Sequence, residues 1–358
     1  MRALIPTRTT AELLAMGAIL AAMVLLSGCG GGGATVGSVT PLPTKQVLII
    51  NGLGKTLSVI DPTTNTIQNN VVPLGEAPNQ LQTRGVYAYV VNSVSNNVQI
   101  IDMTASPAPQ TVGTIDLGAG SNPWAIQFVS DTKAYVSDML TNKVSVLQVN
   151  GGSGSVVKAI DVGIAPEGMA TANGKVYVCC TAFDSVTFGY GQGTVRVIDV
   201  ASDTVTKVIN VGTNPQAAAV GADGNVHVLC TGNYFDEFGA VYRIDPTTNT
   251  VTGAPIALGG SPGSLVVAPN GKAYAADWTL GVLSYNSATG AVLHAAASPL
   301  KLGKGVNGGI ADSTGKLYVG NFDDDTVSIL DTADDQVVTA LGAGDGPQGG
   351  GSRSRVPR

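Results

Sequence analysis

The chain has 358 residues, of which 44% are hydrophobic, 5% aromatic and only 12% charged, and it contains 47 glycines. Low charge combined with many apolar residues excludes an intrinsically disordered chain, and the lack of a Gly-x-y period excludes collagen. A formal net charge of −6 removes the attraction that supplies most nonspecific affinity for nucleic acids, so we expect no nucleic-acid partner.

Residues 1–28 are predicted to be an export signal. Two arginines near the start are followed by an apolar run over residues 13–26, which is too short for a comfortable membrane span of about 20 residues. The run ends in Leu-Ser-Gly-Cys and so resembles a bacterial lipoprotein signal, in which Cys29 would be acylated. The alternative is an ordinary signal peptide with a cysteine there by chance. The resemblance implies a lipid-anchored protein of the bacterial cell envelope, with residues 29–46 as a tether rich in Gly and Ser.

A short strand-like segment then recurs seven times. It reads VLIIN, AYVVN, AYVSD, VYVCC, VHVLC, AYAAD and LYVGN, at intervals of 41 to 50 residues. Each copy is followed by a second alternating segment, a turn, a third segment that runs to a glycine, and a fourth that opens near a proline in most copies. Alternation with a period of two, bounded by turn residues, predicts β-strands. Four strands per repeat predict an all-β fold, a seven-bladed β-propeller with four antiparallel strands per blade, as one domain over residues 47–358.

An aspartate stands before the turn that follows the second segment in five of the repeats. The hexapeptide Asp-Pro-Thr-Thr-Asn-Thr occurs twice, at 61–66 and at 245–250. Because an aspartate accepts backbone N–H bonds at such turns, we interpret these residues as structural. They are Asp61, Asp102, Asp199, Asp245 and Asp331.

Two segments carry a family resemblance. Residues 321–331 read NFDDDTVSILD and residues 269–272 read PNGK, within a repeat of the form Y-V-x-N, T-V-S-V-I-D and V-G-x-x-P. This pattern resembles the YVTN-type propeller repeat of bacterial surface and periplasmic proteins. One fold hosts many activities, so the resemblance is specific for the fold and weak for function. It also extends to propellers of quinoprotein-type dehydrogenases and lactonases, which makes an enzyme working at the central mouth the alternative to a binding protein.

The two ends of the repeat array indicate how the ring closes. The first repeat has no Pro-initiated strand of its own, whereas the last repeat continues into Pro-Gln-Gly-Gly at 347–350. An open ring would leave strand edges unpaired, so we expect Pro347 to about Arg355 to supply the innermost strand of the first blade. That segment is poor in apolar residues, and residues 38–46 are the alternative.

If the Pro-initiated strands are innermost, the residues that follow the prolines form a ring at the mouth of the central channel. Most are uncharged hydrogen-bonding groups that suit a polar, water-lined opening. The alternative is that they only satisfy backbone groups at the strand starts. Glu167 is the only acid of the ring, which argues against lactonase-like or quinone chemistry. The ring consists of Asn79, Trp124, Glu167, Gln216, Gly263, Asn307 and Gln348.

Two neighbouring loops are unusually long for this repeat, at 181–193 in the fourth blade and 231–239 in the fifth. Exposed aromatic residues on a rigid scaffold are typical of recognition surfaces, so we predict that these loops bind a protein, peptide or glycan partner. The alternative is that the loops pack on each other as a small cluster. Together they hold six of the eighteen Phe, Trp and Tyr residues, namely Phe183, Phe188, Tyr190, Tyr234, Phe235 and Phe238.

The remaining cysteines are Cys179, Cys180 and Cys230. We expect buried free thiols. The alternative is a disulfide between Cys180 and Cys230, because these two residues hold the same repeat position in neighbouring blades.

Catalytic and metal-binding signatures are scarce. The sequence has no Cys-x-x-Cys-His and no His-Glu-x-x-His, and two histidines are too few for a His-rich metal centre. His227 replaces the tyrosine of the repeat, which predicts a packed core histidine. Asp323–Asp325 lacks calcium-loop spacing and is interpreted as a solvated loop. We therefore expect no cofactor, no metal, and a monomer that binds its partner without catalysis.

Overall fold

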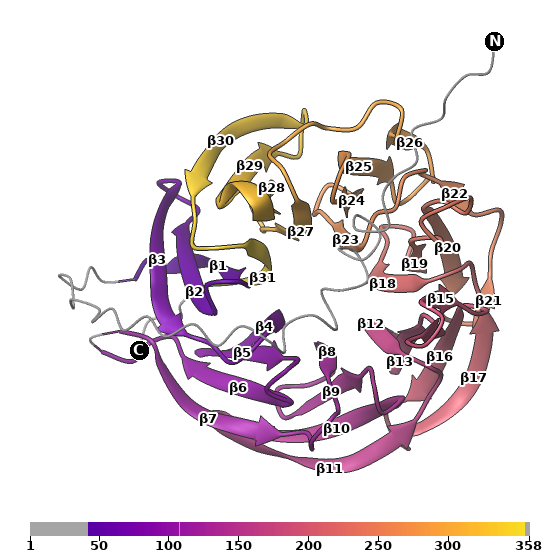
Figure 1. Cartoon of the computed structure of the whole chain (residues 1–358), viewed down its shortest axis with the longest axis horizontal. Helices are drawn as coiled ribbons and strands as arrows, with labels where there is room; N and C mark the ends of the chain where they lie inside the picture. Colours follow the sequence, from indigo (N-terminus) through magenta and orange to yellow (C-terminus); the bar gives the residue numbers. More distant parts are fainter. Residues whose placement is uncertain (1–41, 107, 355–358) are drawn as a thin grey trace.

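The computed structural model describes residues 42–106 and 108–354. These residues form seven antiparallel sheets around a central axis, which confirms the predicted seven-bladed β-propeller (Figure 1). The predicted export signal at residues 1–28 and the predicted lipidation site Cys29 lie outside the described residues. In the part of the chain that is described, no helix is long and apolar enough to cross a membrane.

The first three blades have four strands each. From the innermost strand to the outermost, blade 1 consists of β31 (Pro347–Ser354), β1 (Lys45–Asn51), β2 (Thr56–Asp61) and β3 (Thr66–Pro73). In the same order, blade 2 consists of β4 (Pro78–Arg84), β5 (Tyr87–Asn92), β6 (Asn97–Asp102) and β7 (Gln110–Asp116). Blade 3 consists of β8 (Pro123–Phe128), β9 (Lys133–Asp138), β10 (Lys143–Asn150) and β11 (Ser153–Asp161).

The other blades follow the same order, with additions in blades 4, 5 and 7. Blade 4 consists of β12 (Pro166–Ala172), β13 (Lys175–Cys180), β16 (Thr194–Asp199) and β17 (Thr204–Asn210), with the small hairpin β14 (Phe183–Asp184) and β15 (Gly189–Tyr190) in its long loop. Blade 5 consists of β18 (Pro215–Val220), β19 (Val226–Cys230), β20 (Ala240–Asp245) and an outer edge divided into β21 (Thr250–Val251) and β22 (Ile256–Ala257). Blade 6 consists of β23 (Ser264–Val267), β24 (Lys272–Asp277), β25 (Gly281–Asn286) and β26 (Val292–His294). Blade 7 consists of β27 (Val306–Ala311), β28 (Lys316–Asn321), the 3₁₀ turn η2 (Phe322–Asp324), β29 (Thr326–Asp331) and β30 (Gln336–Gly342).

The ring closes as predicted, through the C-terminal segment. Strand β31 pairs antiparallel with β1, with a register that runs from Lys45 opposite Ser354 to Asn51 opposite Pro347. Figure 1 shows this last strand completing the first blade beside β1. The segment is poor in apolar residues because its backbone packs closely: a Cβ atom on Gly350 would lie 1.8 Å from the carbonyl oxygen of Leu48.

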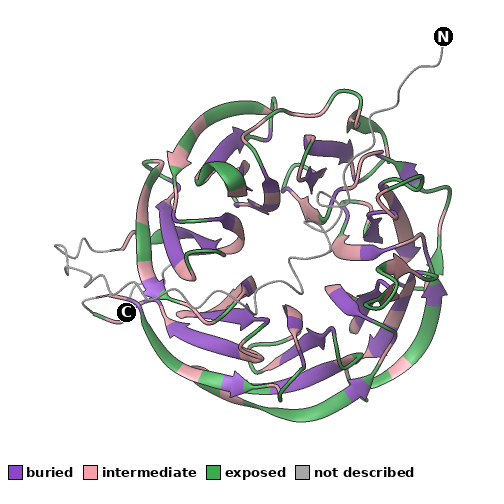
Figure 2. Cartoon of the chain, viewed as in Figure 1, coloured by how far each residue is buried: buried purple, intermediate pink, exposed green. Residues whose placement is uncertain are grey.

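The hydrophobic core is divided among the contacts between neighbouring blades. The described residues contain seven buried clusters, and each cluster joins one pair of adjacent blades. At the closure, Val47 and Ile49 of β1 pack against Tyr318 of β28 and Ile329 of β29. Figure 2 shows the second and third strands of the blades mostly buried, the innermost strands largely half-buried and the outermost strands largely exposed. Each blade therefore needs both neighbours to bury its two faces.

The recurring tyrosine of the second strand joins blades 2, 3, 4 and 6 to the next blade, whereas Tyr318 of blade 7 donates to Asp312 Oδ2 within its own blade at 3.1 Å. The hydroxyl of Tyr274 donates to Asp335 Oδ1 at 2.6 Å, and Lys272 Nζ lies 2.9 Å from Asp335 Oδ2. His227 holds this position in blade 5 and is fully buried, with its Nδ1 2.8 Å from the hydroxyl of Tyr285 in blade 6. It is the packed core histidine that the sequence predicts.

The repeated aspartates cap turns, as predicted. The backbone N–H of Thr63 donates to Asp61 Oδ1 at 2.8 Å, and that of Thr247 donates to Asp245 Oδ1 at 2.7 Å. These turns lie between the third and fourth strands of a blade, at the end of the propeller away from the mouth. The capped turns stabilise the propeller at this end, and the candidate functional residues lie at the opposite end.

Candidate functional site

Two sets of loops form one face of the propeller, which we call the mouth face. The loops between the second and third strands donate backbone hydrogen bonds to the loops that lead into the innermost strands. Examples are Ser93 N to Ala77 O at 2.9 Å in blade 2 and Thr231 N to Asn214 O at 2.9 Å in blade 5. The repeated pairing makes the two sets of loops one continuous surface.

Six of the seven predicted ring residues line the central channel at this face. They come from six different innermost strands or strand starts, which bring them together although they are far apart in the sequence (Figure 1). The six are Asn79, Trp124, Gln216, Gly263, Asn307 and Gln348.

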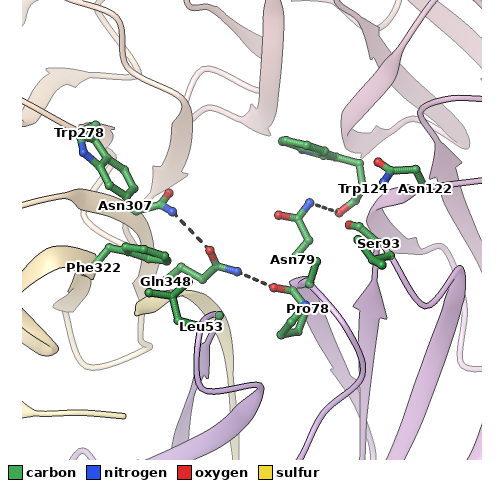
Figure 3. Close-up of a pocket in the computed structure, with 13 residues that line it drawn as sticks. Leu53, Pro78, Asn79, Ser93, Asn122, Trp124, Trp278, Asn307, Phe322 and Gln348 are labelled. Atoms are coloured by element: carbon green, nitrogen blue, oxygen red, sulfur yellow. Dashed lines mark hydrogen bonds between the residues drawn. The ribbon is translucent and has the colours of Figure 1, made fainter. Parts of the chain in front are cut away.

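Three of the four ring amides bond to a neighbouring blade. Asn79 Nδ2 donates to the carbonyl of Trp124 at 2.8 Å, and Gln348 Nε2 donates to the carbonyl of Pro78 at 2.5 Å. Asn307 Nδ2 donates to Gln348 Oε1 at 3.4 Å (Figure 3). These contacts join blades 7, 1, 2 and 3, so on this side of the ring the amides do more than satisfy backbone groups within one strand. Gln216 Oε1 instead accepts from Thr231 Oγ1 within blade 5 at 3.0 Å.

Glu167 is placed differently from the other six ring residues. Its side chain is 3% exposed, and its Oε2 has no hydrogen-bond partner among the described residues. Burial raises the pKa of this carboxyl well above its usual range. Burial is the main cause of the raised pKa values of Tyr190 and Tyr234. The negative charge of an ionised Glu167 raises both pKa values further. Glu167 therefore lies near these two tyrosines of the aromatic loops, beneath the surface.

A pocket on the mouth face brings together residues of blades 6, 7, 1, 2 and 3. Trp124 and Asn79 belong to the predicted ring, whereas Trp278 and Phe322 come from the short loops after β24 and β28. Figure 3 shows Trp278 and Phe322 on one side and Trp124 on the other, with the amides between them. We call this the tryptophan pocket; it is lined by Gly52, Leu53, Ala77, Pro78, Asn79, Ser93, Val94, Asn122, Trp124, Trp278, Asn307, Phe322 and Gln348.

Sequence reasoning missed part of this pocket. Trp278, Phe322, Leu53 and Val94 were not predicted as site residues, because their loops are short. A signal was present: each is a large apolar residue one or two positions after the polar or carboxylate residue that ends the second strand.

The aromatic loops of blades 4 and 5 contain both an internal cluster and an exposed surface. The ring centroids of Phe183 and Tyr190 are 5.4 Å apart, and those of Tyr190 and Tyr234 are 6.2 Å apart across the two loops. Phe188, Phe235 and Phe238 are 57%, 67% and 58% exposed. The inner aromatics support the loops, and the three phenylalanines face solvent.

The cysteines are buried and free in the described part of the chain. Cys179 and Cys230 share the cluster between blades 4 and 5, whereas Cys180 belongs to the cluster between blades 3 and 4. The strand alternation thus places Cys230 nearer to Cys179 than the repeat position suggests. Burial raises the pKa of Cys180 to about 11 and that of Cys230 to about 12, which favours the unreactive thiol.

Within residues 42–106 and 108–354, no group of three or more His, Cys, Asp or Glu side chains is placed to hold a metal ion. Asp323 and Asp324 lie in the exposed turn η2, where Asp324 Oδ2 accepts the backbone N–H of Lys304 at 2.8 Å. This contact gives at least one of the acids a structural use.

No protein-family model matches the chain, and no curated protein matches it. Solved structures do match. The chain is similar to a functionally unknown protein of Desulfotomaculum acetoxidans DSM 771, with a TM-score of 0.65, 16% identity, and coverage of 87% of this chain and 99% of that one. It is similar to hydrazine synthase of Kuenenia stuttgartiensis, with a TM-score of 0.61, 18% identity, and coverage of 75% and 87%.

A third similar structure is virginiamycin B lyase of Staphylococcus aureus, with a TM-score of 0.57, 11% identity, and coverage of 74% and 83%. The chain is a β-propeller. At these identities the likeness extends to the fold alone, since propellers carry unrelated activities on the same scaffold. The function of this propeller therefore has to be argued from its own mouth face.

Proposed function

We propose that the protein is a non-enzymatic binding propeller of the bacterial cell envelope, related to the YVTN-type repeat proteins and anchored through a lipid on Cys29. Its mouth face binds a protein, peptide or glycan partner. The observation that carries this proposal is the uneven distribution of exposed apolar side chains over the surface.

Of the 18 large hydrophobic residues that are exposed in the described chain, eight lie in loops of the mouth face. Nine others lie on the outermost strands, where they are spread around the circumference, and only Val220 lies toward the opposite end. Apolar side chains gathered on one face of a soluble scaffold are typical of an interaction site. The eight are Leu53, Val94, Leu140, Ile164, Val186, Phe188, Phe235 and Phe238.

The construction of the propeller suits such a role. The second and third strands that carry the loops are anchored in the buried clusters between blades, so the side chains are presented on a rigid base. Rigid aromatic residues bury a large area on binding and lose little conformational entropy.

A pull-down from envelope extract tests the binding function. The wild-type chain is compared with a variant that carries Tyr190→Ala, Tyr234→Ala and Phe235→Ala. A matched control carries Val157→Ala, Val208→Ala and Val338→Ala, which remove exposed valines of the outermost strands. We call the triple variant Tyr190→Ala, Tyr234→Ala and Phe235→Ala the mouth variant. We expect the mouth variant to lose the partner and the control to keep it. Equal retention by both folded variants contradicts a partner site on the aromatic loops.

Anchoring is tested separately. Cys29→Ser should release the protein from the membrane fraction, and mass spectrometry of the wild type should show an acylated N-terminus. A soluble wild-type protein without acyl chains contradicts this part of the proposal.

An enzyme is the second candidate, and one observation favours it. Glu167 is a buried carboxyl with a raised pKa and an unpaired oxygen, which are features found in acid–base catalysts. Its 3% exposure argues for a structural role, because a substrate does not reach it in this conformation. Glu167→Gln should leave partner binding unchanged; any turnover by the wild type that this variant abolishes would favour the enzyme.

A further inference from the structure

Both tryptophans of the chain line the tryptophan pocket. Trp124 lies on one side, while Trp278 lies on the other with its ring centroid 5.1 Å from that of Phe322 (Figure 3). The chain thus places its two largest flat apolar surfaces around one opening. Such surfaces suit a ligand that has a flat face of C–H groups.

Amide groups occupy the space between these aromatic rings. Asn79, Asn307 and Gln348 lie there, and a side-chain amide offers two N–H donors and a carbonyl acceptor. Asn79 uses one donor on the carbonyl of Trp124. The side-chain Oδ1 atoms of Asn79 and Asn307 accept no hydrogen bond from the described residues, since both amides use only their Nδ2 groups. The pocket therefore presents both donors and acceptors to a ligand.

Charge narrows the ligand class further. None of the described side chains that line the pocket is ionisable. A phosphate, a carboxylate or an ammonium group would gain from an opposite charge, and this pocket supplies none. A neutral ligand fits these walls best.

We propose that the tryptophan pocket binds a neutral saccharide. A pyranose ring stacks its C–H face on Trp124 or Trp278, and its hydroxyls bond to the amides of Asn79, Asn307 and Gln348. This inference rests on the proposed binding function and names the ligand class of the mouth face.

A proline-rich peptide is the main competitor, since aromatic grooves also bind polyproline helices. Proline has no backbone N–H, so such a peptide offers carbonyl acceptors and leaves an acceptor such as Asn307 Oδ1 unpaired. A sugar hydroxyl both donates and accepts, and so satisfies both kinds of group in the pocket.

The experiment begins with the purified full chain on a printed glycan array that carries neutral and acidic glycans. The glycan bound best is then titrated while tryptophan fluorescence is recorded. Because the sequence has two tryptophans and both line this pocket, a saturable change reports binding at this site. A decaproline peptide is titrated in parallel.

Variants locate the site by calorimetric titration. Trp124→Ala and Trp278→Ala should each weaken binding of the glycan by about tenfold or more. Trp124→Phe keeps an aromatic ring and should lose less. Val157→Ala, which removes an exposed side chain of outermost strand β11, should change the affinity less than about twofold. Circular dichroism melts show whether each variant is folded.

The proposal is overturned if no neutral glycan binds, if decaproline binds instead, or if both folded tryptophan-to-alanine variants bind as the wild type does. The proposed function fails separately: if the mouth variant loses its partner in the pull-down while no glycan binds, the mouth face is a binding surface and only the ligand class is wrong. If neither assay shows binding at this face, both proposals fail.

Discussion

The aromatic rings of Tyr190 and Tyr234, which belong to loops of adjacent blades, lie with their centroids 6.2 Å apart. The contact joins the two longest loops of the mouth face, and both phenols are largely shielded from water, which raises their pKa values. The loops thus support each other and leave Phe188 and Phe235 exposed. The exposed residues of this part of the mouth face are therefore held in place by packed side chains beneath them.

This contact predicts that the two loops are coupled. In the second loop, the backbone N–H groups of Phe235, Asp236 and Glu237 all donate to Asn233 Oδ1. Tyr190→Ala should loosen that loop by about 1 kcal/mol, which raises the hydrogen-exchange rates of these amides about fivefold.

Val186→Ala is the matched control, because Val186 is on the same loop as Tyr190 and is 84% exposed. It should leave exchange over residues 233–239 unchanged. Equal exchange in the Tyr190→Ala variant and the wild type would show that the loops are independent.

A second prediction concerns Asp138, which ends β9 where blades 1, 2 and 7 have asparagine. Asn51 and Asn321 donate to Ser58 and Ser328, and Asp138 instead accepts from Ser145 Oγ at 2.6 Å. Burial raises the pKa of Asp138 to about 7, against 3.8 for the unperturbed group.

Between these two pKa values the folded chain holds more of this proton than the unfolded chain does, so stability falls as the pH rises through that window. The substitution Asp138→Asn removes this pH-dependent loss of stability. The variant should match the wild type near pH 4 and be more stable at pH 8 by about 1 to 3 kcal/mol in urea unfolding. Asp161→Asn, on a side chain that is 90% exposed, should change little at either pH. An Asp138→Asn effect that does not depend on pH would disprove the assignment.

For His227 we expect folding stability to change with pH in the opposite direction. Burial lowers the pKa of this imidazole, although Asp223 lies 2.9 Å from its Nε2. The unfolded chain therefore takes up a proton first as the pH falls below about 6.5, and stability is lost. The stability advantage of the wild type over His227→Gln should shrink by about 1 kcal/mol between pH 7 and pH 5. A constant advantage would mean that the histidine titrates alike in both states.

Ring closure is tested by two neighbouring glycines of β31. A Cβ on Gly350 would lie 1.8 Å from Leu48 O, whereas the nearest atom to a Cβ on Gly349 is 3.9 Å away. Gly350→Ala should lower the free energy of unfolding by about 2 kcal/mol or more, and Gly349→Ala by less than about 0.5 kcal/mol. Thermal melts of the two variants that coincide would indicate that β31 does not pack against β1 in solution.

Much of the fold could be predicted because the repeat is local. Each blade carries its own alternating strands and turn residues, and the missing strand of blade 1 is visible as the surplus at Pro347. The divided outer edge of blade 5 was not predicted, since an outermost strand has only one neighbour and the pattern there is weak.

The site could be predicted only in part, because it depends on contacts between blades. The position after each proline, or after Val306 in blade 7, identifies six channel-lining residues, but it does not show that Glu167 turns into the protein. The tryptophan pocket joins Trp124 to Trp278 from blades that are not adjacent in the ring. A repeat can show that a large apolar residue follows its second strand, but the meeting of Trp124 and Trp278 follows from closure of the whole ring.

Cross-linking of the protein to its partner in intact cells tests the role of the mouth face most directly. Lys55 and Lys304 lie in mouth-face loops, whereas Lys158 and Lys207 lie on the outermost strands β11 and β17. After treatment with a lysine-reactive cross-linker, mass spectrometry should find partner peptides joined to Lys55 and Lys304. Partner peptides joined only to Lys158 and Lys207 would contradict the account.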